Sequence, residues 1–212
     1  MLSNTDLLES GINELGIKIP RNLIDNLLIY NNFLVKWNKI FNLTAIRNQK
    51  QIFTHHFLDC LAVMPFIKSN SILDVGTGAG FPGIVLALCY PEKQLTLVDA
   101  VGKKIAFIKQ ITGELNLTNV RVIHRRVENM DVAEKFDGII ARAFSEMEML
   151  IKLTQPVIAS DGYWYGMKSK KIMNNEMDKI DYHWEMKKIK VPYLDAERYL
   201  IQVKNSLIYN TI

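Results

Sequence analysis

A run of glycines behind an acidic residue is the part of this sequence with the clearest chemical potential. At the end of the apolar run "SILDV", alternate positions are occupied by Asp74, Gly76, Gly78 and Gly80. Glycines at such a turn let a nucleotide approach the backbone closely. The dinucleotide pattern G-x-G-x-x-G fits only when counted from Gly78, two residues late, and it then places Pro82, which has no N–H for a pyrophosphate, in the first helical turn. We therefore expect a nucleotide ligand without a pyrophosphate.

The same run, acid-x-G-x-G-x-G, resembles the first motif of class I methyltransferases that use S-adenosylmethionine (SAM). The glycines let the loop bend under the methionine and ribose without Cβ collisions. Asp74, at the carboxyl end of an expected strand, suits the cationic amino group of the methionine moiety, directly or through water. Asp99 ends the next apolar run, "LTLVDA", and can accept both ribose hydroxyls. In the alternative, structural interpretation, both aspartates merely cap helices.

Two patterns of hydrophobic periodicity divide the chain near residue 68. Residues 1–68 show helical spacing, with a long amphipathic helix after Pro20, a loop over 38–44 and a further helix over 51–67. From Ser71 on, short β-rich runs alternate with helical stretches, which predicts parallel strands joined by crossover helices. The expected strands are 72–75, 95–98, 120–123, 138–141 and 162–167, followed by a polar helix over 170–181 and an antiparallel pair, 186–191 and 199–203.

We therefore expect an α/β fold, the Rossmann-like three-layer sandwich of class I SAM-dependent methyltransferases. Its mixed sheet would have an antiparallel edge strand. Residues 1–68 would form an N-terminal helical extension, and residues 69–212 would form the SAM-dependent methyltransferase domain. Because the carboxyl ends of parallel strands share one edge of the sheet, this fold would bring Asp74 and Asp99 together.

Longer segments carry a more specific resemblance. The segments "NLTAI", "HHFLDC", "LDVGTGAGFPGIVLA", "LTLVDAVGKKIAFIKQI" and "FDGIIARAF" closely resemble the bacterial RsmG family, also called glucose-inhibited division protein B, from about residue 42 to 203. The family methylates N7 of a guanine in 16S ribosomal RNA. The resemblance therefore implies SAM as the cofactor and 16S rRNA or a small ribosomal subunit precursor as the partner. It also implies SAM contacts at Gly76, Phe81, Val127, Glu128 and Arg142.

Each implied contact has a physical role. Phe81 can wall the cofactor pocket. Val127 and Glu128 follow the third expected strand and can read adenine through a backbone N–H and a side-chain acceptor. Arg142 ends the fourth expected strand, where it can hydrogen-bond guanine O6 or an adjacent phosphate and so serve as the catalytic residue.

The implied chemistry needs few reactive side chains. N7 of guanine carries an in-plane lone pair and no proton, so a single in-line displacement requires no base. In agreement, the sequence has no activated nucleophile and no Asn/Asp-Pro-Pro-aromatic tetrapeptide of the kind that grips an exocyclic amine. The two cysteines, Cys60 and Cys89, lie in apolar runs, so we expect buried free thiols and no metal site.

Basic residues follow the ends of several expected strands. Because those ends share one edge of the sheet, the basic residues can form a track for RNA phosphates. The candidates are Lys103, Lys104, Arg125, Arg126, Arg142, Lys168, Lys170 and Lys171, with Lys36, Lys39, Arg47 and Lys50 as a second contact on the N-terminal helices. Phe144 is a candidate for stacking on an extruded base, and core packing is the alternative.

The composition is that of an ordinary globular protein, 49% hydrophobic and 23% charged, with a net charge of +4. The first ten residues lack the features of a signal peptide, and no apolar run reaches the roughly 18 residues of a membrane span. We therefore expect a cytoplasmic protein without membrane contact. The sequence shows no signal for an oligomer, so we expect a monomer. The runner-up function keeps the fold and methylates a small molecule or a protein. The intact glycine motif disfavours a non-enzymatic RNA-binding module, and an NAD-linked oxidoreductase would lack a proton-relay residue near the pocket.

Overall fold

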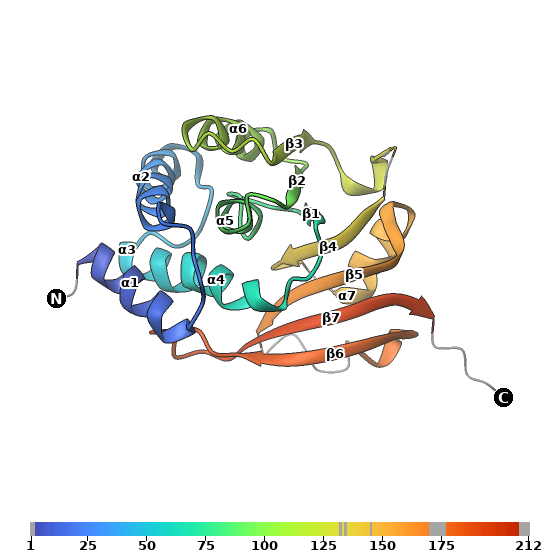
Figure 1. Cartoon of the computed structure of the whole chain (residues 1–212). Coiled ribbons are helices and arrows are strands. Elements are labelled where there is room, and N and C mark those ends of the chain that lie inside the picture. The colour runs from blue at the N-terminus through green and yellow to red at the C-terminus, as the bar shows by residue number, and fades with distance from the viewer. Residues whose placement is uncertain (1–2, 132, 134, 145, 170–176, 208–212) are drawn as a thin grey trace.

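A seven-stranded sheet forms the centre of the molecule (Figure 1). The computed structural model describes residues 3–131, 133, 135–144, 146–169 and 177–207. The strands lie in the order β3-β2-β1-β4-β5-β7-β6, and β1 to β5 are parallel, as expected. The strand bounds are β1 Ser71–Val75, β2 Gln94–Asp99, β3 Val120–His124, β4 Phe136–Arg142, β5 Ile158–Ser169, β6 Tyr182–Ile189 and β7 Arg198–Leu207.

The last strand, β7, lies between β5 and β6 and is antiparallel to both. The mixed sheet is therefore confirmed, but the antiparallel strand is one position in from the edge, and β6 is the edge strand. The physical reason is burial. Leu200, Ile201 and Val203 of β7 are fully buried, which suits an internal strand, whereas β6 is exposed along most of its length.

Helices cover both faces of the sheet, which confirms the three layers. One face carries α5 (Gly83–Cys89) and α6 (Gly102–Glu114), and the other carries α7 (Met147–Thr154). Every residue of α5 is buried. This follows from its position, because the N-terminal helices cover the side of α5 that faces away from the sheet (Figure 1).

The N-terminal helices are α1 (Asn4–Leu15), α2 (Leu23–Phe41), α3 (Gln49–Ile52) and α4 (Asp59–Val63), and a π-helical turn, Phe53–Leu58, joins α3 to α4. The expected loop over 38–44 is partly wrong, because α2 continues to Phe41. Helical spacing persists there, since Trp37 packs on Phe41 with 5.0 Å between ring centroids. The helix ends at Asn42, whose φ is 51°.

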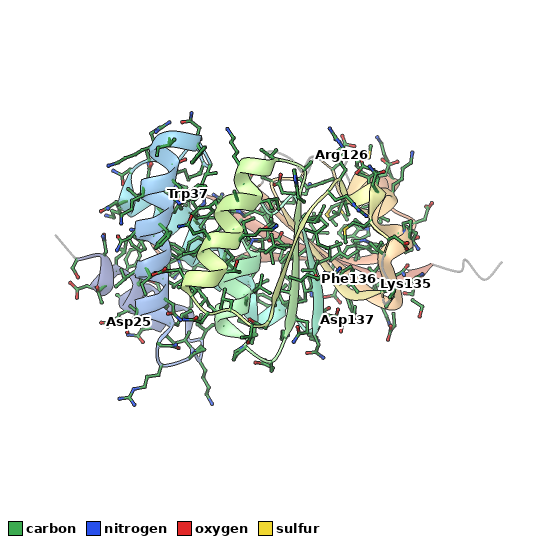
Figure 2. All side chains as sticks on the ribbon, turned by 90° about the horizontal axis from the view of Figure 1, so that it is seen from above. Asp25, Trp37, Arg126, Lys135, Phe136 and Asp137 are labelled. Carbon is green, nitrogen blue, oxygen red and sulfur yellow. The ribbon has the colours of Figure 1, made fainter. Side chains whose placement is uncertain are left out.

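The N-terminal helices and the sheet share one hydrophobic core. Trp37 illustrates this, because it lies between α2 and α6 (Figure 2) and contacts Phe107 of α6 with ring centroids 5.6 Å apart. Trp37 and Phe41 are thus packing residues. The division of the chain into two domains near residue 68 stays a prediction.

The fold also bears on the expected polar helix, the two cysteines and the membrane-spanning segments. The polar helix expected over 170–181 falls mainly outside the described residues, and Met177–Lys179 forms a 3-10 turn. Cys60 and Cys89 are buried free thiols, as predicted. In the part of the chain that the structure describes, no helix combines the length and apolar character needed to cross a membrane.

Candidate functional site

The glycine loop after β1 is a tight turn built from left-handed residues. Gly76, Gly78 and Gly80 have φ angles of 64°, 64° and 91°, a region in which a side chain is strained. At Gly80 an added Cβ would also lie 2.5 Å from Cδ1 of Ile84. Gly76 instead faces open space, where the nearest atom to an added Cβ is Cδ2 of Phe144 at 4.0 Å. The loop therefore presents bare backbone at Gly76.

Asp74, at the end of β1, is fully buried beneath this loop. Its Oδ2 accepts hydrogen bonds from Thr77 Oγ1 (2.6 Å) and from the backbone N–H of Gly83 (2.8 Å), the first residue of α5. The structural interpretation, a helix cap, therefore holds for Asp74. Its Oδ1 has no hydrogen-bond partner among the described residues. A contact of Asp74 with the cofactor's amino group stays a prediction.

The buried carboxyl of Asp74 should make stability depend on pH. Burial raises the pKa of Asp74 from 3.8 to about 6, although the hydrogen bonds from Thr77 and Gly83 limit the rise. Between these two values the folded state binds more protons than the unfolded state. The free energy of unfolding should therefore decrease as the pH rises from about 4 to about 6, by up to about 3 kcal/mol. Urea unfolding measured across that range should show a clearly smaller decrease for Asp74→Asn. An identical pH dependence in the two proteins would contradict the assignment.

Asp99, at the carboxyl end of β2, holds the same loop from the other side. Its Oδ2 accepts a hydrogen bond from the backbone N–H of Gly78 (3.0 Å), and its Oδ1 accepts one from that of Val101 (2.9 Å). Lys104 Nζ lies 3.6 Å from Oδ2. Unlike Asp74, Asp99 lines an open cavity. Its fixed carboxylate can accept hydrogen bonds from the hydroxyls of a ribose there.

That cavity, here called the cofactor cleft, has a volume of about 370 Å³ and opens between the turns that follow β1, β2, β3 and β4. The predicted residues that line it are Gly76, Asp99, Val127, Glu128 and Arg142. The other predicted glycines and Asp74 shape the loop behind it. Two carboxylate acceptors beside bare backbone suit an adenosine group that carries no phosphate, so the residues present fit SAM.

Arg142, at the end of β4, forms one wall of the cofactor cleft. Its Nη1 donates a hydrogen bond to the carbonyl of His55 (3.1 Å) and lies 3.1 Å from Nδ1 of His56. The same nitrogen is 3.6 Å from Oδ2 of Asp59. All three partners belong to the π-helical turn or to α4. The N-terminal helices therefore hold this guanidinium in place.

Phe81 lies behind the wall of the cofactor cleft, and its contact with SAM stays a prediction. Phe81 is 3% exposed and lines neither this cleft nor the second cavity described below. Its ring is stacked between those of Tyr30 (5.1 Å between centroids) and His56 (4.7 Å). Cζ of Arg142 lies 5.0 Å from the Phe81 centroid. Phe81 thus supports Arg142 from behind.

His56 is a neutral support for Arg142. Burial, and to a smaller extent the charge of Arg142, lowers the pKa of His56 to about 3. Because arginine can only donate, Nδ1 of His56 is the acceptor toward Arg142. Its Nε2–H then donates to Thr44 Oγ1, 2.9 Å away. This imidazole is therefore neutral and does not repel the guanidinium.

A second cavity, also of about 370 Å³, lies on the other side of Arg142. Arg142 and Ala143 line both this second cavity and the cofactor cleft. Ala143 has a φ of 57°, a strained value for a residue with a side chain and one that is frequent at functional sites. The second cavity is lined by polar side chains from distant segments, which include Thr44, His55, Asp59, Ser169, Arg198 and Tyr199.

Sequence reasoning missed Arg198 and the role of Asp59. Arg198 begins β7, and its Nε donates a hydrogen bond to Oδ1 of Asp59 (3.2 Å), which is 5% exposed. One signal was present, because an aspartate inside the apolar segment 58–63 must find a cationic partner when buried. The spacing could not show which cations those partners are, because 139 residues separate the pair.

The predicted basic track is present in part. Lys104, Arg125 and Arg126 line the cofactor cleft, and Lys103 is exposed at the start of α6. The expected phosphate contact of Lys168 is wrong. This residue is 4% exposed, and its Nζ donates a hydrogen bond to the carbonyl of Phe144 (3.2 Å), so it cannot serve as an exposed phosphate contact.

The remaining nucleic-acid candidates have mixed outcomes. Lys170 and Lys171 lie outside the described residues. Lys36, Lys39, Arg47 and Lys50 are exposed on the N-terminal helices and the loop between them. Phe144 is partly buried and lines the cofactor cleft. This position is compatible with both alternatives, stacking on a base and packing in the core. Within the described ranges, no three His, Cys, Asp or Glu side chains gather as metal ligands.

Comparison with known proteins confirms the resemblance seen in the sequence. The family model described as "GidB: rRNA small subunit methyltransferase G" matches residues 23–200. The ribosomal RNA small subunit methyltransferase G of Methylobacillus flagellatus is 44% identical over 195 residues, which cover 92% of this chain and 95% of that protein. The enzyme of the same name from Francisella tularensis subsp. novicida is 40% identical over 202 residues, covering 95% and 98%.

A solved structure supports the fold independently. A SAM-dependent methyltransferase from Aquifex aeolicus superimposes with a TM-score of 0.59 at 15% identity, over 81% of this chain and 97% of that one. The expected fold, that of class I SAM-dependent methyltransferases, is thereby confirmed. Together with the matches over nearly the whole length, these findings show that the chain belongs to the rRNA small subunit methyltransferase G family.

Proposed function

We propose that this chain transfers the methyl group of SAM to N7 of one guanine in 16S ribosomal RNA. The observation that carries the proposal is the junction of two cavities at Arg142 and Ala143. One cavity contains the residues of the SAM motif, and the other combines polar and charged side chains with apolar ones. A methyl donor in the first and a base in the second would have their reacting atoms next to each other.

The residues of the cofactor cleft divide the recognition of SAM among them. Asp99 would accept hydrogen bonds from the ribose hydroxyls. Val127 would offer a backbone N–H to an adenine ring nitrogen, and Glu128 would accept from the exocyclic amine. Gly76 leaves room beside the backbone. When bound, SAM supplies a methyl group attached to a positively charged sulfur, which makes that carbon electrophilic.

The chain's contribution to catalysis is then mainly one of orientation. N7 is already a free lone pair, so no residue has to remove a proton before attack. Holding two reactants in line can contribute roughly 7–11 kcal/mol relative to free encounter in solution. Arg142 would orient the base through O6 or a neighbouring phosphate. Its guanidinium is held in place by the neutral imidazole of His56 and by the carboxyl group of Asp59.

The rim of the cofactor cleft supports an RNA acceptor. Lys104, Arg125 and Arg126 surround the opening, where they would bind phosphates next to the target nucleotide. A base in folded RNA must leave its stack to enter such a cavity, and Phe144, which lines the neighbouring cofactor cleft, would contact that base only at the junction of the two cavities. The partner would be 16S rRNA or a small ribosomal subunit precursor, and the enzyme would act in the cytoplasm as a monomer.

The test is methylation of RNA that lacks the modification. Purified protein is incubated with isotope-labelled SAM and small-subunit RNA from cells without the enzyme, either deproteinised or within the subunit. Nucleosides are then analysed by mass spectrometry. We expect label in N7-methylguanosine at one position. In a control substrate, 7-deazaguanine replaces the target guanine and should receive none. Label on another atom, or transfer to small molecules or proteins alone, would overturn the proposal.

A further inference from the structure

We propose that the second cavity holds the target guanine and that Asp59 and Arg198 select guanine over adenine by reading its Watson–Crick edge. The inference rests on the proposed function, because it presumes a base as methyl acceptor. It adds the identity of the residues that recognise this base. Neither residue was singled out for such a role by the sequence motifs.

The position of the second cavity makes it the place for the acceptor. Among the described residues, the two cavities share only Arg142 and Ala143, so a ring that fills the second cavity would present one edge at this junction. For methyl transfer, that edge must be the one that carries N7. The Watson–Crick edge lies on a different side of the purine, and it would then face residues that line the second cavity but not the cofactor cleft. Asp59 of α4 and Arg198 at the start of β7 are two of these residues.

The Asp59–Arg198 pair presents one acceptor and one donor side by side. Nε of Arg198 is 3.2 Å from Oδ1 of Asp59, and Nη1 of Arg142 is 3.6 Å from Oδ2. The aspartate is thus held through both oxygens and cannot rotate freely. Two guanidiniums next to one carboxylate leave an excess of positive charge, which favours an electron-rich carbonyl in the cavity. Asp59 itself is 5% exposed, so its remaining acceptor capacity acts in a largely water-free setting.

These groups match guanine and oppose adenine. The Watson–Crick edge of guanine offers the O6 carbonyl as acceptor and N1–H and the 2-amino group as donors. Arg198 would donate to O6, and Asp59 would accept from N1–H and the amino group. Adenine has an amine where guanine has O6 and an unprotonated N1. It would place a donor against Arg198 and a lone pair against Asp59.

The first experiment changes the Watson–Crick edge of the target base with two analogues: one lacks the 2-amino donor, and the other changes both O6 and N1. Target RNAs carrying guanine, inosine (no 2-amino group) or 2,6-diaminopurine (an amine in place of O6) are methylated by the wild-type protein. We expect kcat/KM to fall about 10-fold or more for each analogue. Asp59→Asn should lose most of the discrimination against inosine. Arg198→Met should lose part of the discrimination against 2,6-diaminopurine, because the unprotonated N1 of that base still faces Asp59, and it should keep the discrimination against inosine. Lys109→Met, which removes an exposed cation of α6, should leave every ratio unchanged.

The ratios distinguish recognition from a structural role. If Asp59 and Arg198 serve only packing, each variant lowers kcat/KM for all three RNAs equally, and the inference is overturned. Arg198→Met keeps the Asp59–Arg142 pair, so it decides the question alone if Asp59→Asn fails to fold. Arg198→Lys should recover part of the discrimination, because it restores a donor. SAM binding measured by calorimetry should stay within about 2-fold in Arg198→Met, since this residue does not line the cofactor cleft.

Failure of this inference is separable from failure of the proposed function. If the wild-type protein methylates none of the guanine RNAs, the proposed function fails. If it methylates guanine at N7 while the variants keep the wild-type ratios, only the role of Asp59 and Arg198 fails.

Discussion

Replacing Arg142 with methionine should reduce kcat/KM for RNA methylation by about 100-fold or more. The guanidinium lines both cavities at their junction and is fixed by His55, His56 and Asp59. Methionine keeps much of the volume over Phe81 but has no donor with which to orient the base. Single-turnover rates with saturating SAM and RNA measure the effect on the chemical step directly.

The matched control for Arg142 is Arg125→Met. Arg125 lines the same cleft but is exposed, and its Nη1 donates a hydrogen bond to the backbone carbonyl of Asn129 (3.3 Å). Its loss should weaken RNA binding modestly and reduce the salt dependence of binding by about one ion, while the single-turnover rate at saturation stays near wild type. If Arg142→Met is within about 3-fold of wild type in that rate, Arg142 has no place in the reaction.

Replacing Gly83 with alanine should destabilise the protein by about 3 kcal/mol and abolish SAM binding. An added Cβ would lie 2.7 Å from Oδ2 of Asp74 and 2.8 Å from Cγ of Leu97, both of them buried. Relief requires moving α5, whose first N–H is bonded to Asp74. That movement would also shift the glycine loop above Asp74. Urea unfolding measures the stability, and calorimetry measures the binding.

Gly113→Ala provides the opposite case in the same fold. Gly113 lies in α6 and is exposed, and no atom lies within 4 Å of an added Cβ. Alanine favours helix over glycine, so this variant should be more stable than wild type by up to about 1 kcal/mol, with unchanged SAM affinity. Equal stability of the two variants would show that the crowding at Gly83 is relieved without strain.

Local pattern was enough to predict the strand and helix alternation, the glycine loop and the positions of Asp99 and Arg142. Strand and helix periodicities are carried by neighbouring residues, and a turn with positive φ strongly favours glycine. Because parallel strands place their carboxyl ends at one edge, the sequence order alone was sufficient to bring Gly76, Asp99 and Arg142 to one cleft.

The tertiary structure alone decided how that cleft is supported and what lies beside it. Phe81 turned out to be stacked behind Arg142, and Asp74 to be buried as a helix cap. The insertion of β7 between β5 and β6 brings Arg198 to Asp59 across 139 residues. Such contacts depend on which buried surfaces pack together over the whole chain, and no local propensity encodes the partner of a single buried charge.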